Sequence, residues 1–261
     1  MRSSGIAMLV LVAAASSAAA QQTADFRWTG RLAPGGRLEV KGVNGDIRAV
    51  AASGNEIVVT AAKRARRSDP EDVKIEVVQF DGGVTICAVY PTPMRARREN
   101  VCEPGDAWHS STENNDVKVD FEVQVPAGIE FAGQTVNGEM SAEGLKGDVK
   151  ASSVNGSVRV TTTGLAEAST VNGSVYVEMG RANWTDELDF STVNGTITLV
   201  MPAKLDTDVR ASTVNGDIDS DYPLTVTGKF GPRRVRGTIG AGGRTLNLST
   251  VNGEIRLKKS T

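Results

Sequence analysis

The sequence predicts an all-β protein whose strands form a β-solenoid, a single-chain, β-helix-like stack of coils of about 20 residues each. The main observation is a phrase ending in Val-Asn-Gly that occurs seven times. From the second copy onward, its Asn residues are 18, 17, 22, 21 and 37 positions apart. A nearly fixed period of this length is typical of a stacked repeat architecture. The predicted corners are Asn44-Gly45, Asn137-Gly138, Asn155-Gly156, Asn172-Gly173, Asn194-Gly195, Asn215-Gly216 and Asn252-Gly253.

The residues at and after each corner explain why the chain turns and then extends. Asn and Gly both tolerate the positive φ that a tight turn between strands requires, so we expect positive φ at the Asn positions. The stretches after the turns alternate apolar and polar residues, as residues 157–160 and 196–199 do. This alternation is typical of half-buried strands.

The residues before each Asn add information that turn chemistry does not. A turn does not require the same Val in front of every Asn, whereas coils stacked at about 4.8 Å place equivalent residues above one another. We therefore expect ladders of Asn or Thr at the corners and one inward ladder formed by Val154, Val171, Val193 and Val214. Val251, near the last coil, should have a neighbour on only one side. A meander of hairpins is the second interpretation.

Two stretches resemble incomplete corners. Residues 235–239, Val-Arg-Gly-Thr-Ile, lie inside the gap of 37 residues and keep the Val and Gly of the phrase. Residues 80–84 lie at the same distance of 37 residues after Asn44. Both stretches predict degenerate coils.

Residues 1–20 have the composition of a secretory signal peptide. Arg2 is followed by an apolar run at residues 6–15 and by three Ala at residues 18–20, the small-residue pattern of a cleavage site. The apolar run is too short and too rich in Ala for a membrane span. We therefore expect an exported protein, periplasmic or secreted to the cell surface.

The remaining chain divides into two predicted parts. Residues 21–133 form an N-terminal β region continuous with the solenoid, and residues 134–261 form the Val-Asn-Gly repeat. Residues 68–72 carry an N-cap pattern, but strand-like alternation follows, so at most one helical turn fits there. With 29 basic and 31 acidic residues the charge is too nearly balanced to indicate nucleic acid as a partner.

Cys87 and Cys102 are the two cysteines of the chain. In an exported protein such a pair predicts a disulfide, which contributes roughly 3 kcal/mol by closing a loop of about 15 residues. A redox or metal pair is disfavoured because neither a Cys-x-x-Cys spacing nor clustered His accompanies the cysteines.

Two clusters of basic residues are candidates for binding anions. A run of charge is most simply a solvated surface, and binding of anionic envelope polymers or phosphates is the alternative. The clusters are Arg95, Arg97 and Arg98 inside the cysteine loop, and Arg233, Arg234 and Arg236 near the end of the chain.

Little in the sequence points to catalysis. His109 is the single histidine, so a metal site built from several His is excluded, and its neighbours Ser110 and Ser111 do not by adjacency form a catalytic triad. We expect no catalytic residues, no metal and no cofactor. Carboxylate pairs for glycoside hydrolysis stay open, because β-helices can carry such sites on a flank.

The chain resembles the bacterial putative-adhesin family of exported β-strand-repeat domains of unknown function. The resemblance covers residues 25–258 and is carried by Leu38-Glu39-Val40 before the first Val-Asn-Gly, by the lead-in at residues 123–126, and by the tandem Asn-Gly units. It implies a β-helix-like fold and an envelope or surface setting, and it brings no catalytic residues.

Together these observations predict a non-enzymatic, exported envelope protein that acts as an adhesin-like binding or structural scaffold. Its partner would be an envelope component, glycan or protein. The alternatives are a polysaccharide-active enzyme on a β-helix and an envelope-stress accessory protein. A cleft with clustered charged residues would favour the enzyme, and a smooth flank of Ser, Thr and Asn ladders would favour the scaffold.

Overall fold

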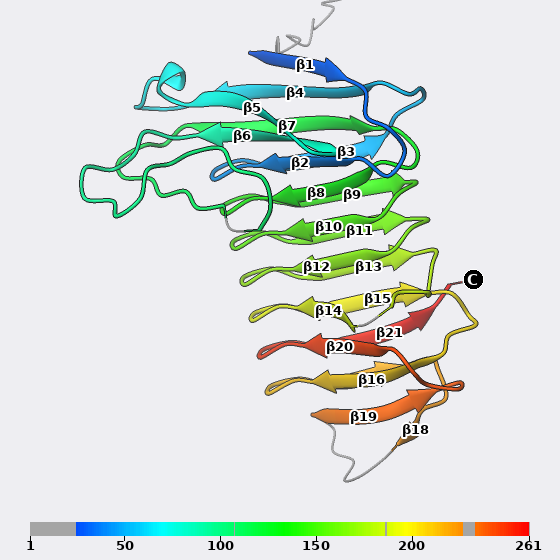
Figure 1. Cartoon of the computed structure of the whole chain (residues 1–261). Helices are drawn as coiled ribbons and strands as arrows, with labels where there is room; N and C mark the ends of the chain where they lie inside the picture. The colour runs from blue at the N-terminus through cyan, green and yellow to red at the C-terminus, as the bar shows by residue number, and fades with distance from the viewer. Residues whose placement is uncertain (1–24, 107, 186, 227–232, 261) are drawn as a thin grey trace, which may run out of the picture.

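A computed structural model describes residues 25–106, 108–185, 187–226 and 233–260 of the chain (Figure 1). The predicted signal peptide lies outside the described residues. The described part consists almost entirely of β-strands, with one 3₁₀ turn at Pro70–Asp72, where the sequence predicts at most one helical turn. None of the helical structure in these ranges is long and apolar enough to cross a membrane.

The strands form two sheets that face each other along the stack. In spatial order, sheet A contains β1 (Phe26–Gly30), β4 (Ile57–Arg64), β7 (Lys118–Val125), β3 (Ile47–Ala51), β9 (Met140–Leu145), β11 (Val158–Thr162), β13 (Val175–Met179), β15 (Ile197–Met201), β21 (Ile255–Lys259) and β17 (Ile218–Ser220). Sheet B contains β18 (Thr225–Val226), β19 (Arg234–Ile239), β16 (Thr207–Ser212), β20 (Thr245–Ser249), β14 (Glu187–Ser191), β12 (Ala166–Ser169), β10 (Val149–Ser152), β8 (Glu130–Gln134), β2 (Arg37–Lys41), β6 (Gly83–Val89) and β5 (Lys74–Phe80).

Each coil consists of one strand of sheet B, a Val-Asn-Gly corner and one strand of sheet A. Successive coils pair in parallel, so Val158 lies beside Val175, and Val175 beside Ile197. These three side chains are at most 1% exposed and fill the space between the sheets. Parallel pairing confirms the predicted β-solenoid and excludes the meander, whose neighbouring strands would be antiparallel.

The order of the coils in space differs from their order in the chain. The coil of Asn44 stacks directly on that of Asn137, 93 residues later. The C-terminal coil, β20 and β21, lies between the coil of Asn194 and that of Asn215, as the red strands of Figure 1 show. The prediction of a terminal coil at Val251 is therefore wrong. The repeat period identifies the coils, but it does not determine which coil stacks on which.

This order can be tested with two matched substitutions. Ile255 is fully buried between Ile197 and Ile218, whereas Ile218 belongs to the last coil of sheet A and is only partly buried. We expect Ile255→Ala to lower the free energy of unfolding by about 2–5 kcal/mol and Ile218→Ala to lower it less. Urea denaturation measures both, and a larger loss for Ile218→Ala would contradict the interposed coil.

Neither incomplete corner forms a coil. Residues 235–239 lie in β19, which pairs antiparallel with β16. Residues 80–84 contain the turn of the antiparallel hairpin β5–β6, where Gly82 has a φ of 78°. Both predictions of a degenerate coil are therefore wrong. A coil corner needs the Asn side chain as well as the Gly, and neither stretch has that Asn.

Candidate functional site

The seven corner Asn residues form one continuous ladder of side-chain amides. In six of the seven residues, all but Asn44, the Nδ2 donates to the Oδ1 of the Asn in the neighbouring coil at 2.7–2.8 Å. The bonds run in a single direction through all seven corners. In spatial order the ladder contains Asn44, Asn137, Asn155, Asn172, Asn194, Asn252 and Asn215.

The backbone at these Asn residues differs from the prediction. Among the described residues other than Gly, Asn114 is the one with a positive φ, so no corner Asn has the left-handed conformation expected of it. The prediction of positive φ at the corner Asn residues is therefore wrong, whereas the corner residues Gly45 and Gly253 do have positive φ. The Asn side chain, through its amide ladder, explains the repetition of this residue.

At six of the seven corners, all but that of Asn44, which follows Gly42 and Val43, the residue two positions before the Asn points inward. It is Thr or Ser, at most 6% exposed, and its hydroxyl donates to the backbone carbonyl of the corner Gly in the neighbouring coil at 2.8–3.0 Å. A buried carbonyl needs such a partner. The donors are Thr135, Ser153, Thr170, Thr192, Thr213 and Thr250.

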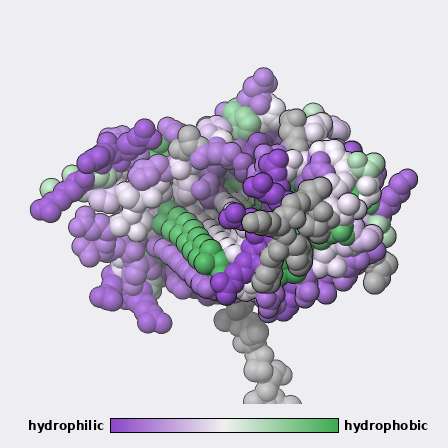
Figure 2. All heavy atoms as spheres, turned by 90° about the horizontal axis from the view of Figure 1, so that it is seen from below, coloured by the Kyte–Doolittle hydropathy of each residue, from purple (hydrophilic) through white to green (hydrophobic). Residues whose placement is uncertain are grey.

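The Val between Thr and Asn points outward, so the predicted inward Val ladder is wrong. The exposed fraction is 38% for Val154, 39% for Val171, Val193 and Val251, and 54% for Val214. Side chains alternate along an extended backbone, so an inward Thr forces the following Val to face solvent. Figure 2 shows a straight apolar row on the surface, the arrangement that stacked, exposed Val side chains produce.

The outward Val changes the expected effect of truncation. Val193→Ala should lower the free energy of unfolding by about 1 kcal/mol or less, because the side chain is partly solvated already. Thr192→Val, at a position 4% exposed, should cost about 1–3 kcal/mol, because the Gly173 carbonyl loses its hydroxyl donor. Denaturation midpoints measure both, and the opposite ranking would contradict the orientation of the corner.

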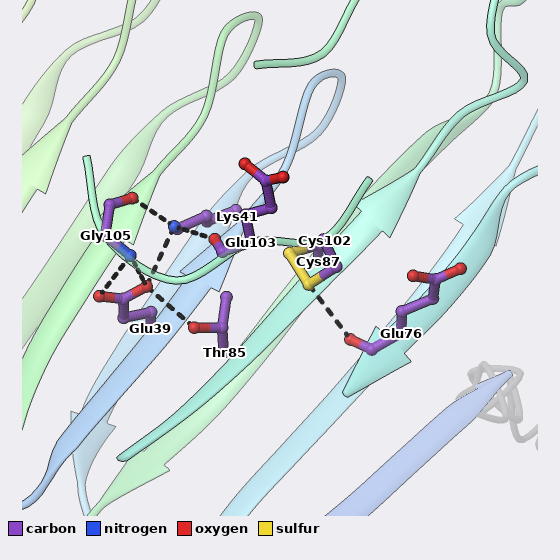
Figure 3. The surroundings of a disulfide bond; sticks show 8 residues. All are labelled: Glu39, Lys41, Glu76, Thr85, Cys87, Cys102, Glu103 and Gly105. Atoms are coloured by element: carbon purple, nitrogen blue, oxygen red, sulfur yellow. Dashed lines mark hydrogen bonds and ion pairs between the residues drawn. A yellow bond between two sulfur atoms is a disulfide. The ribbon is translucent and has the colours of Figure 1, made fainter. Parts of the chain in front are cut away.

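The predicted disulfide is present and holds a long loop over sheet B. Cys87 on β6 is bonded to Cys102 with a Cα–Cα distance of 5.5 Å, and the described residues contain no free cysteine (Figure 3). Asn100 secures the same loop, since its Nδ2 donates to the carbonyls of Tyr90 (3.1 Å) and Ser111 (2.7 Å).

A buried ion pair fastens the loop beside the disulfide (Figure 3). The Lys41 Nζ lies 3.0 Å from the Glu39 carboxylate and donates to the carbonyls of Glu103 and Gly105, each at 2.6 Å. Burial opposes ionisation of Glu39, but bonds from the Gly105 N–H, Lys41 and Thr85 outweigh it and lower its pKa. The Glu39 carboxylate therefore stays ionised inside the protein, and the loop backbone provides hydrogen-bond partners for both side chains.

The two predicted arginine clusters lie at opposite ends of the stack. Arg95, Arg97 and Arg98 are exposed on the disulfide-bonded loop, whereas Arg233, also exposed, precedes β19. Seven strands of sheet B lie between β6 and β19. The structure therefore does not bring the clusters together.

A further arginine joins the second cluster. Arg210 on β16 lies directly opposite Arg236 on β19, and Arg234 occupies the same face two residues away. Sequence inspection misses Arg210 because it is more than 20 residues from the cluster and stands alone in its strand. The antiparallel pairing of β16 and β19, where the sequence predicts a coil, places it there.

Residues 37–258 match the family model described as Toastrack DUF4097. The protein belongs to this family. A putative cell adhesion protein from Clostridium sporogenes has a solved structure with a TM-score of 0.47 and 13% identity, covering 90% of this chain and 99% of that one. A putative adhesin from Bacteroides fragilis gives a TM-score of 0.27 and 12% identity, covering 90% and 96% of the respective chains. None of the curated proteins matches the chain.

The histidine and its two neighbouring serines do not form a catalytic triad in this Toastrack domain. His109 is exposed on the loop, and the Oγ atoms of Ser110 and Ser111 are buried without a hydrogen-bond partner among the described residues. Neither Ser is therefore bonded to His109 as a triad would require. The described residues also contain no group of three or more His, Cys, Asp or Glu that could hold a metal ion.

Among the described residues, three carboxyl groups have clearly shifted pKa values, and all three are lowered. Glu39 is the first of these groups. The second is Asp106, whose pKa is lowered by the hydrogen bond from the Lys150 side chain. Backbone N–H donors led by that of Ser68 lower the pKa of Asp116 to about 2. Glycoside hydrolysis needs one carboxyl group with a raised pKa as general acid. The pKa values of Glu39, Asp106 and Asp116 are lowered instead, so none of these three carboxyl groups suits the role of general acid.

Proposed function

We propose that this Toastrack protein is a non-enzymatic binding scaffold of the cell envelope. Its partner is an envelope polymer or protein that lies along the coils. The observation that carries the proposal is the uninterrupted Asn ladder, which presents the same amide group at every coil level.

The outer face of sheet B supports the same proposal. Equivalent Ser residues stand side by side on consecutive strands and add a row of hydroxyls next to the corner. A regular row of uncharged hydrogen-bonding groups suits an extended partner with a repeating structure better than a small substrate held at one point. The row contains Ser152, Ser169, Ser191, Ser249 and Ser212.

Binding and catalysis can be separated with the protein that starts at residue 21. We expect saturable binding to at least one isolated envelope fraction, with no release of reducing sugar ends from it. Release of reducing ends would support the polysaccharide-active enzyme instead. Absence of binding to every envelope fraction would contradict the scaffold.

Export is the second part of the proposal and rests on residues 1–20. A fusion of residues 1–24 to alkaline phosphatase, which is active only outside the cytoplasm, should give phosphatase activity in a bacterial host. Replacing Leu9 and Leu11 in the apolar run by Arg should abolish that activity. An inactive wild-type fusion that is present at normal abundance would contradict export.

A further inference from the structure

Three arginines form a cationic groove near the end of sheet B that contains β16 and β19. Arg210, Arg234 and Arg236 are exposed on one face of the antiparallel strands β16 and β19. Together with Ser212 and Ser249 they line a groove of about 400 Å³, which we call the arginine groove.

The charges in the arginine groove are not balanced as they are elsewhere on the same sheet. Arg37 and Lys150 on sheet B each have a carboxylate within 4.0 Å. In the part of the chain that the structure describes, no carboxylate lies that close to the guanidinium groups of Arg210, Arg234 or Arg236. Like charges directly opposite each other on paired strands are destabilising. This arrangement therefore reduces stability in the free protein, and an anionic ligand would relieve the repulsion.

The carboxylate that lines the groove is hydrogen-bonded to a neighbouring strand. Asp189 on β14 also lines the groove, but the strand β20 separates it from Arg210. Its Oδ1 accepts a hydrogen bond of 2.8 Å from the Nδ2 of Asn247. The Asp189 end of the groove is therefore the end that an anion would avoid, which leaves the side of β16 and β19.

The geometry of the groove suits a phosphate group. Arg210 and Arg236 lie on neighbouring strands, roughly 5 Å apart at the backbone, and Arg234 and Arg236 are separated by roughly 7 Å along one strand. Guanidinium groups bind phosphate oxygens through two parallel hydrogen bonds each. Ser212 lies opposite Arg234, and Ser249 lies beside Ser212 on β20, so their hydroxyls add donors for the remaining oxygens on one side of the Arg210–Arg236 pair.

We propose that the arginine groove binds the phosphate groups of an anionic envelope polymer linked by phosphodiesters. The polymer as ligand rests on the function proposed above, whereas the phosphate chemistry rests on the three arginines alone. The groove opens on the outer face of the sheet and lies at one end of the Ser row. A phosphate bound there would fix the end of a polymer whose other units lie along the coils.

The proposal can be tested by titrating the protein with inorganic phosphate, poly(glycerol phosphate), uncharged dextran and vesicles of phosphatidylglycerol. The variant is Arg210→Gln/Arg236→Gln, and the matched control is Arg48→Gln, an arginine that is also exposed but lies on sheet A. We expect wild type to bind poly(glycerol phosphate), the double variant to bind it at least tenfold more weakly, and Arg48→Gln to bind it unchanged. The unliganded double variant should have an unchanged or raised denaturation midpoint, because like charges have been removed.

Each other result has a definite meaning. Equal binding of poly(glycerol phosphate) by wild type and the double variant would show that the arginine groove is not the binding site. Binding of vesicles or inorganic phosphate without binding of poly(glycerol phosphate) would overturn the phosphodiester-linked polymer as the ligand. If the double variant binds an envelope fraction as well as wild type does, the arginine groove is not the binding site, but the proposed scaffold function is still supported. If the wild-type protein binds no envelope fraction, the scaffold function itself is contradicted.

Discussion

Replacing Gly195 by Ala should destabilise the protein by about 3 kcal/mol or more. A Cβ at this position would overlap the carbonyl oxygen of Gly173 in the neighbouring coil and lie 2.5 Å from its carbonyl carbon. Backbone atoms cannot move aside as the end of a flexible side chain can. The added methyl group would therefore force two coils apart and weaken the Asn and Thr bonds that join them. Urea denaturation monitored by circular dichroism measures the loss.

Gly54→Ala is the matched control. Gly54 is exposed and does not have a positive φ, and a methyl group added there would meet no heavy atom within 4 Å. We expect its free energy of unfolding to change by less than about 0.5 kcal/mol. A similar small effect at both positions would show that the corner Gly is not required for close stacking.

Replacing Lys41 by Met should cost about 3–5 kcal/mol. The substitution leaves the Glu39 carboxylate, on a residue 2% exposed, with only the partly exposed Arg37 as a cation among the described residues, and it removes the donor from the carbonyls of Glu103 and Gly105. The disulfide-bonded loop should then exchange its amide hydrogens faster. Lys63→Met, which removes an ion pair to a largely exposed Glu71, should cost at most about 1 kcal/mol. Equal losses would contradict a structural role for the buried pair.

The same pair gives stability a pH dependence. The pKa of Glu39 is lower in the folded state than in the unfolded chain. Its contribution is therefore present above the unfolded pKa and is lost as the pH falls through the folded pKa. In Lys41→Met the Glu39 pKa should rise, so part of the acid-dependent loss of stability should occur at higher pH than in wild type. Chemical denaturation as a function of pH measures this shift.

The β-solenoid could be predicted from the sequence because identical residues recur at a regular spacing, and stacking is the physical reason for such identity. The orientation of the corner was predicted incorrectly. Val is more hydrophobic than Thr, but Thr192 faces inward because the carbonyl of the neighbouring Gly needs a donor there. Hydrophobicity alone does not reveal that requirement.

The position of the C-terminal coil and the arginine groove could not be predicted for a different reason. Both depend on strand β19, which pairs antiparallel with β16 although its sequence resembles a corner. Without that pairing Arg210 has no connection to Arg236. The disulfide, in contrast, could be predicted because the two cysteines have no other partner among the cysteines of the chain.

The most direct test of the interposed coil is a comparison of two double-cysteine variants with the Cys87–Cys102 bond intact. The backbone N–H of Val251 donates to the carbonyl of Val193, and that of Val214 donates to the carbonyl of Val251, each at 3.2 Å. Neighbouring strands are about 4.8 Å apart, within the range that a disulfide spans, whereas residues two coils apart are separated by roughly 9.6 Å, which is too far. We expect Val193→Cys/Val251→Cys to form the new disulfide on mild oxidation, detected by peptide mapping, and Val193→Cys/Val214→Cys to keep two free thiols. The reverse result would show that the coils stack in the order of the chain.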